Sequence, residues 1–135
     1  MLRFCLLSSG SAGNALLVAS ATTKILIDVG LSFRQLHCRA EAVGESLDGL
    51  RAVFITHEHN DHVSGAGVLA RRTGIPFHMT PGTAAGLPSG TGAVSRVALF
   101  EAGDAVSVDD MIVTSFPVSH DAADPVGYVV ESGGA

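Results

Sequence analysis

Short apolar runs alternate with clusters of glycine, serine, threonine and aspartate along most of this chain. Runs of roughly four to eight apolar or β-branched residues, bounded by such turn residues, are typical of β-strands. The pattern therefore indicates many short strands and few helices. The strands that it predicts lie at residues 2–7, 15–18, 24–27, 50–55, 77–80, 96–100, 105–108, 111–116 and 126–131.

Helical spacing of apolar residues marks two segments between these strands. Residues 32–47 and residues 64–72 carry apolar side chains at intervals that suit one face of a helix. The loop at 81–92 is rich in glycine, proline, serine and threonine, with one helical turn expected at 83–87. This order of elements is typical of an α/β fold with a mixed sheet and helices on one face.

The predicted strand at 50–55 is followed by a dense group of metal-binding residue types. Residues 56–62 read THEHNDH, so three of the six histidines of the chain lie within this segment. Imidazole and carboxylate are the ligand types that zinc and similar metals use. The spacing lets His57 and His59 turn toward one ion, and Asp61 and His62 toward a second. The competing interpretation is a solvated polar loop that happens to hold three histidines.

Two further residues occupy equivalent places after other predicted strands. His120 follows the strand at 111–116, and we predict it as the third histidine of the first metal. The alternative is a surface histidine in a turn. Asp28 ends the strand at 24–27, where its carboxylate can accept a hydrogen bond from a ligand histidine and orient it. The alternative is an ordinary turn aspartate before a glycine.

Together these residues form the pattern of a dinuclear hydrolytic site. In such sites two ions about 3.5–4 Å apart clamp a water molecule and lower its pKa toward neutrality. Asp61 is the candidate catalytic residue, because its carboxylate can orient the attacking water. Zinc is the expected metal, with two ions if the site is complete, although manganese and iron accept the same ligands.

Other polar positions carry weaker signals. The segment SSGSAGN at 8–14 can turn backbone N–H groups toward an anion or can simply connect a hairpin. His37 and His78 fall inside a predicted helix and a predicted strand, so we expect surface or core roles for them rather than metal ligation.

Composition limits the class of protein. A length of 135 residues suits one domain with a genuine core. No apolar run approaches the roughly 20 residues of a membrane span. Two cysteines make no disulfide framework, and a cytoplasmic location fits. The net charge of −5 argues against a broadly basic surface for nucleic acid, but two divalent ions would add about four positive charges locally.

The motifs together resemble the metallo-β-lactamase superfamily. HEHNDH at 57–62 follows a strand, with Asp28 upstream and His120 downstream, in the order of that superfamily. LSSGSAGNA at 7–15 and SHDAADPVGY at 119–128 resemble its YycJ/WalJ branch of bacterial cytoplasmic proteins, which is grouped with nucleases and phosphodiesterases. The resemblance covers essentially the whole chain.

This resemblance implies a fold, an activity and a set of ligands. The fold is an αββα sandwich of two αβ halves, with the metals at the edge between the sheets. The activity is hydrolysis by a metal-bound hydroxide, and in the branch a 5′-to-3′ exonuclease action on duplex DNA. By motif position, His57, His59 and His120 hold the first metal, and Asp61 and His62 hold the second.

The chain departs from the superfamily in its second half. That half supplies a bridging aspartate and a final histidine, and nothing after His120 matches either. We therefore interpret residues 1–135 as a single domain truncated before the second αβ half. An exposed sheet face then favours association, including a homodimer in which two copies stand for the two halves.

Three functional hypotheses follow. The leading one is a metal-dependent phosphodiesterase or DNA exonuclease-like enzyme. The second is a thioester or lactam hydrolase that uses the same residues. The third is a catalytically incomplete half-domain with a structural or assembly role.

Overall fold

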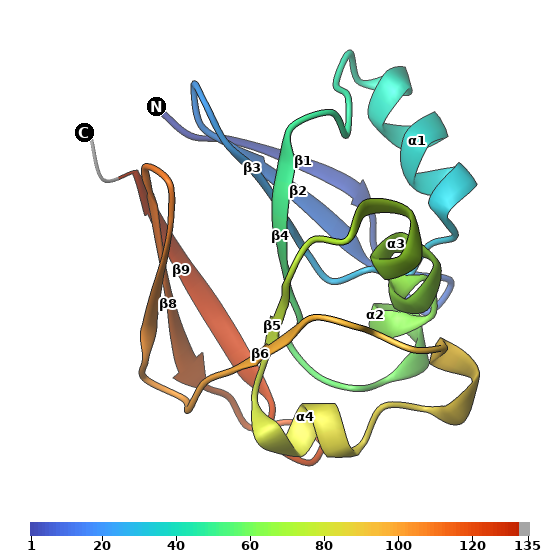
Figure 1. Cartoon of the computed structure of the whole chain (residues 1–135), viewed down its shortest axis with the longest axis vertical. Coiled ribbons are helices and arrows are strands. Elements are labelled where there is room, and N and C mark those ends of the chain that lie inside the picture. The colour runs from blue at the N-terminus through green and yellow to red at the C-terminus, as the bar shows by residue number, and fades with distance from the viewer. Residues whose placement is uncertain (133–135) are drawn as a thin grey trace.

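Six strands form the larger sheet in the computed structural model of this chain, which describes residues 1–132 (Figure 1). The first three strands are antiparallel neighbours, and each later strand runs parallel to the one before it. The mixed sheet predicted from the sequence is thereby confirmed. In spatial order its strands are β1 (Arg3–Ser8), β2 (Ala15–Ala19), β3 (Lys24–Ile27), β4 (Leu50–Phe54), β5 (Phe77–Met79) and β6 (Val97–Leu99).

The last three strands form a second sheet instead of extending the first. They are β7 (Ala105–Val108), β8 (Met111–Pro117) and β9 (Val126–Ser132), all antiparallel. Helices cover one face of the larger sheet, and the second sheet lies against its other face (Figure 1). The helices are α1 (Phe33–Ala42), α2 (Asn60–Val63), α3 (Ala66–Thr73) and α4 (Pro81–Ala85), with a 3₁₀ turn at Ser89–Thr91.

The first helix is shorter than the predicted 32–47. It ends at Ala42, and Gly44 follows with a φ of 74°, a left-handed conformation that glycine adopts without strain. The Glu45 N–H then donates to the carbonyl of Ala40 at 2.8 Å. This cap satisfies a carbonyl that the helix leaves open, so the apolar spacing beyond Ala42 belongs to the connection to β4.

Two other helix boundaries also differ from the prediction. The helix expected at 64–72 is α3, which begins at Ala66 and ends at Thr73, and a separate short helix, α2, precedes it and ends at Val63. The helical turn expected at 83–87 is α4, which begins at Pro81 because the Thr80 side chain caps it and proline is favoured at the first helical position.

The alternation of side chains across the larger sheet builds two apolar cores. Leu26 and Val53 lie in the core beneath the helices, and their neighbours Ile25 and Phe54 lie in the core between the sheets. All four are fully buried, and burying such a side chain contributes about 1.5–3 kcal/mol to stability. Because both faces are covered, β3 and β4 read as continuous apolar runs and not as alternating ones.

The polar residues of interest gather at one edge of this framework. β3 and β4 are parallel, so their carboxyl ends meet at the same edge, and Asp28 and the segment after Phe54 lie there together. The N–H of Val126, the first residue of β9, donates to the Thr56 carbonyl at 2.9 Å, which brings the loop between β8 and β9 to this edge. No helix within residues 1–132 is long and apolar enough to cross a bilayer.

Candidate metal centre

The chain leaves β4 in an extended form that carries two of the candidate ligands. Ile55 is still bound to β5, since its N–H donates to the His78 carbonyl at 3.0 Å. His59 is extended as well, with φ −64° and ψ 145°, and it is the residue before α2. His57 and His59 are therefore two positions apart on an extended segment, which allows both imidazoles to turn to one side.

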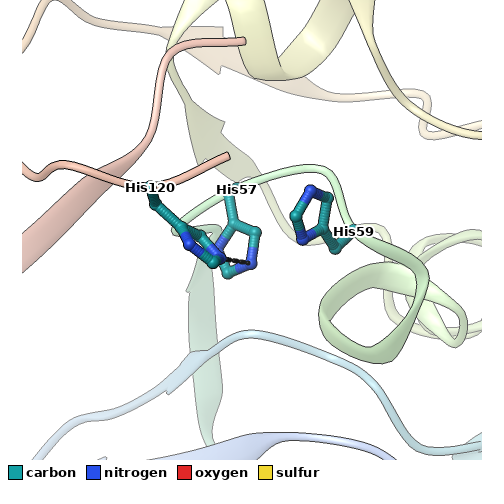
Figure 2. Close-up of side chains that lie close together, drawn as sticks. All are labelled: His57, His59 and His120. Carbon is teal, nitrogen blue, oxygen red and sulfur yellow. Dashed lines mark hydrogen bonds between the residues drawn. The ribbon is translucent and has the colours of Figure 1, made fainter. Parts of the chain in front are cut away.

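The third candidate, His120, comes from the loop that joins β8 to β9. Its neighbours close this loop at its base, where the Val118 N–H donates to the Pro125 carbonyl at 3.2 Å. Figure 2 shows the His120 ring beside the rings of His57 and His59. One ring nitrogen from each of the three residues lies within 4.8 Å of the others. Residues that are 63 positions apart in sequence thus meet in one cluster.

Hydrogen bonds determine which nitrogen of His57 is free. The Thr56 hydroxyl donates its one proton to Asp28 Oδ2 at 2.8 Å and lies 2.9 Å from His57 Nδ1. Because that proton is already committed, the Thr56 oxygen must accept from His57, so the proton of the neutral ring is on Nδ1. The lone pair on His57 Nε2 then faces His120 Nε2, which is 3.2 Å away (Figure 2).

This arrangement fits a metal ion held by imidazole nitrogens. Two nitrogens on a tetrahedral zinc, each at 2.0–2.1 Å, lie about 3.3 Å from one another. The separation between His57 and His120 is close to that value. The three-imidazole set is suited to zinc, copper, iron and nickel, so the identity of the metal stays a prediction.

Asp61 and His62 form a second group beside the first. His62 Nδ1 donates to Asp28 Oδ2 at 2.7 Å, which leaves its Nε2 as the free nitrogen. That Nε2 lies 3.7 Å from Asp61 Oδ2. The ring centre of His62 is 4.0 Å from that of His57, so the two groups are adjacent. This nitrogen and oxygen are the donors that the sequence assigned to a second ion, and that role stays a prediction.

Asp28 is the acceptor that organises both groups. Its carboxylate receives the Thr56 N–H at 2.8 Å on Oδ1, and both the Thr56 hydroxyl and His62 Nδ1 on Oδ2. Asp28 itself has a φ of 67°, a conformation that costs a residue other than glycine about 1 kcal/mol or more. The carboxylate is buried, so these hydrogen bonds replace the water that would otherwise stabilise its negative charge.

The pKa values of two neighbouring histidines, His57 and His62, are shifted in opposite directions. The pKa of His57 is lowered to about 4, mainly by burial and then by the nearby charge of His62, with a partial offset from Asp28. At His62 burial also acts to lower the pKa, but the hydrogen bond and negative charge of Asp28 outweigh it and raise the pKa overall. His57 is therefore neutral at pH 7, the form in which imidazole binds metals.

Three residues near the site have roles that the sequence analysis did not assign. Thr56 links Asp28 to His57, as described above. Asn14 lies at the end of the hairpin connection 8–14, where its N–H donates to the Asp61 carbonyl at 2.8 Å and its side-chain amide to Asp61 Oδ2 at 3.2 Å. Glu58 accepts a hydrogen bond from the loop that carries His120. In each case the hydrogen-bond partner, Asp28, Asp61 or Ala123, is distant in the sequence. No local pattern therefore reveals the pairing.

The remaining histidines lie outside the cluster, as the sequence indicated. His37 packs edge-on against Phe33 in α1, and His78 stacks on Phe54 with ring centres 4.6 Å apart. A cavity of about 490 Å³ is lined by Arg51 and Arg96 near the start of β4, whereas the cluster follows the end of that strand. The candidate chemistry is therefore confined to one edge of the sheet.

The chain is similar to known proteins along most of its length. The sequence profile of the beta-lactamase superfamily domain matches residues 23–135. The exodeoxyribonuclease YycJ of Bacillus anthracis is 36% identical over 129 residues, which is 94% of this chain and 49% of that protein. The exodeoxyribonuclease WalJ of Streptococcus pneumoniae is 34% identical over 93% of this chain and 48% of its own length.

Solved structures show the same fold. The Rm3 metallo-beta-lactamase superposes with a TM-score of 0.77 and 22% identity over 91% of this chain and 52% of its own. A metallo-beta-lactamase from Cronobacter sakazakii also gives a TM-score of 0.77, over 96% of this chain and 57% of its own. The chain spans about half the length of the curated relatives it matches. It has the metallo-beta-lactamase fold and belongs to the beta-lactamase superfamily.

Proposed function

We propose that this chain carries the first part of the active site of a metal-dependent hydrolase of the nuclease type. The observation that carries the proposal is the convergence of His57, His59 and His120, with ring nitrogens within 4.8 Å of one another. In particular, the Nε2 atoms of His57 and His120 face each other at 3.2 Å. The lone pair of His57 Nε2 can accept a hydrogen bond from His120 Nε2, and a cation between the two nitrogens would take the place of that proton.

The residues divide into two ligand groups and their supports. His57, His59 and His120 hold the first ion, and Asp61 with His62 holds the second. When bound, such ions act as Lewis acids toward a phosphoryl oxygen and make water a nucleophile at neutral pH. Asp28 keeps the proton of His62 on Nδ1, and through Thr56 it keeps the proton of His57 on Nδ1. Asp61, held by Asn14, orients the attacking water.

We propose DNA as the substrate class and the cytoplasm as the location. The substrate class is supported by two relatives named exodeoxyribonucleases, each matching over more than nine-tenths of this chain. The chain has a net charge of −5, so attraction of a DNA phosphate depends on the positive charge of the ions. Cys5 and Cys38 form no disulfide in the described part of the chain, which suits a reducing compartment.

The decisive experiment is nuclease activity on duplex DNA with zinc or manganese added. The wild-type chain and His59→Ala are compared, since His59 belongs to the cluster and is only half-buried. We expect release of nucleotides by the wild type and loss of at least about 100-fold in the variant. Equal inertness of the two proteins would reject catalysis by this chain and leave the half-domain hypothesis. Hydrolysis of a lactam or thioester instead of DNA would replace the substrate class.

A further inference from the structure

Glu58 lies between two candidate ligands but its side chain serves a different element. Neighbouring side chains of an extended segment point to opposite sides, so Glu58 points away from the rings of His57 and His59. Its Oε2 accepts a hydrogen bond from the Ala123 N–H at 2.8 Å. Ala123 is three residues after His120 in the same loop. Glu58 therefore joins the segment that carries two candidate ligands to the loop that carries the third.

The Glu58 carboxylate is fitted into this place. A Cβ built on Gly86, at the end of α4, would lie 3.1 Å from Glu58 Cγ. The second carboxylate oxygen, Oε1, is buried and accepts no hydrogen bond within residues 1–132. Burial of an unpaired carboxylate oxygen costs free energy, so an ordinary surface glutamate would turn this oxygen to water. The packing against Gly86 and the burial of Oε1 therefore hold the carboxylate where Oε2 meets the Ala123 N–H.

The His120 loop has few other attachments. Val126 and Thr56 join it at its base, and the Thr80 hydroxyl donates to the Asp124 carbonyl at 2.8 Å. Between Val118 and Asp124 the remaining backbone contact is internal, from the Ala122 N–H to the His120 carbonyl. His120 itself is exposed. Within residues 1–132, two hydrogen bonds link this part of the loop to the histidine segment: one between the rings of His120 and His57, and one from Ala123 to Glu58. Of these two, only the bond to Glu58 leaves the candidate ligand nitrogens unused.

We propose that Glu58 is a positioning residue that sets the place of His120 relative to His57 and His59, and so determines the metal affinity of the cluster. The proposal rests on the proposed metal site. Glu58 acts through the Ala123 N–H and touches no metal. Partners that orient metal ligands typically contribute 10–100-fold to metal affinity.

The test is a set of metal titrations on the whole chain with a shape-matched pair of variants. Glu58→Met keeps the length and packing against Gly86 but removes the acceptor, whereas Glu58→Gln keeps an acceptor for the Ala123 N–H. Glu41→Met, on the exposed side of α1, is the control. Zinc affinity is measured by chelator competition, and the visible spectrum of bound cobalt reports the number of nitrogen ligands. Circular dichroism and metal-free melting confirm that each variant folds.

We expect zinc to bind about 10-fold or more weakly to Glu58→Met, within about threefold of wild type to Glu58→Gln, and equally to wild type and Glu41→Met. The cobalt spectrum of Glu58→Met should shift toward that of His120→Ala. In the His120→Ala background, Glu58→Met should have no further effect, because the residue through which it acts is gone.

Two results would overturn the inference while leaving the proposed function intact. One is wild-type zinc affinity in a folded Glu58→Met protein. The other is an undiminished effect of Glu58→Met in the His120→Ala background, which would mean that Glu58 acts elsewhere. Absence of metal binding by the wild type would instead overturn the proposed function, and this inference with it.

Discussion

One carboxylate, that of Asp28, controls the protonation of two histidines. It binds His62 directly and His57 through the Thr56 hydroxyl, and in both rings the proton is held on Nδ1. Both Nε2 atoms are thereby left free on the side where the candidate ligands converge. The site is thus prepared by hydrogen bonds before any ion arrives, which reduces the reorganisation that binding requires.

This relay predicts the effect of changing Thr56. Thr56→Val keeps the shape but removes the hydroxyl, so His57 loses its Nδ1 acceptor and can place its proton on Nε2. We expect zinc affinity to fall by about 10-fold, whereas Thr56→Ser retains it. Chelator competition measures both. Equal affinities of the valine and serine variants would show that the hydroxyl does not control the tautomer.

The lowered pKa of His57 predicts how the metal-free protein responds to acid. Its folded-state pKa of about 4 is below the unfolded value of about 6.5, so between these pH values the unfolded chain binds more protons. The stability that depends on neutral His57 is therefore present above pH 6.5 and lost as the pH falls toward 4. His62, whose pKa is raised, contributes with the opposite sign, through stability that is lost as the pH rises past its folded-state pKa.

Urea unfolding of chelator-treated protein at pH 7, 5.5 and 4.5 measures this response. We expect His57→Gln to reduce the acid-induced loss of unfolding free energy by an amount on the order of 1–3 kcal/mol relative to wild type. Titration of surface carboxylates is common to both proteins and cancels in the comparison. Parallel curves for the two proteins would contradict the assignment of this titration to His57.

Residue types were predictable from the sequence, but their hydrogen-bond partners were not. The spacing of His57, His59, Asp61 and His62 is local, and local spacing is visible in a sequence. The links from Asn14 to Asp61 and from Glu58 to Ala123 join residues 47 and 65 positions apart. Such pairs depend on the meeting of elements in space, which a single sequence does not encode in any local pattern.

Among the elements, the connections after β1, β3 and β4 approach one another very closely. A Cβ built on Gly30, which follows β3, would lie 1.8 Å from the Asp61 carbonyl oxygen. The Gly30 N–H meanwhile donates to the Asn14 carbonyl at 2.8 Å. Any side chain at Gly30 therefore separates the connections that hold Asp28, Asn14 and Asp61, so glycine at this position is a condition for the second ligand group.

Gly30→Ala tests this close approach. We expect a loss of about 1–3 kcal/mol in the free energy of unfolding, as for other overpacked positions, together with weaker binding of the second ion. Gly90→Ala is the control, because a Cβ there meets nothing within 4 Å and its backbone is not left-handed. Calorimetry and metal titration measure the two effects. A Gly30→Ala protein as stable as Gly90→Ala would contradict the described packing.

On the scale of the whole molecule, two apolar side chains of the edge strand β1 remain uncovered. Phe4 is 58% exposed and Leu6 is 62% exposed. They pair with Val18 and Leu16 of β2, whose side chains belong to the core between the sheets. Phe4 and Leu6 therefore continue the apolar surface of that core beyond the part that is covered. Exposed apolar residues on an edge strand favour association with another chain or segment.

We expect this chain to associate as its concentration rises, and the double change of Phe4→Ser and Leu6→Ser to suppress that association. Val43→Ser, which changes an exposed apolar residue outside the sheets, should have no such effect. Sedimentation velocity over a wide concentration range distinguishes these cases. A single monomeric species for the wild type throughout would remove the case for association through β1.

The division into two sheets was the part of the architecture that element order left open. The strands after Phe100 have the same composition as the earlier ones, so their pattern predicts strands without saying which sheet receives them. The choice depends on the packing of Met111 and Val113 against Val18 and Ile25, which is long-range. The resemblance to the first half of a sandwich led us to expect one sheet with an exposed face, whereas β7, β8 and β9 form a second sheet that packs on that face.

The proposed function depends first on whether His57, His59 and His120 hold a metal ion. Its most direct test is the number of zinc ions bound per chain at equilibrium, measured by elemental analysis after dialysis against buffered zinc, for wild type and His120→Ala. We predict at least one tightly bound ion per wild-type chain, and an affinity at least about 10-fold weaker in the variant. A wild-type chain free of zinc, or a variant that binds zinc as tightly as wild type, would show that these histidines do not form the metal site.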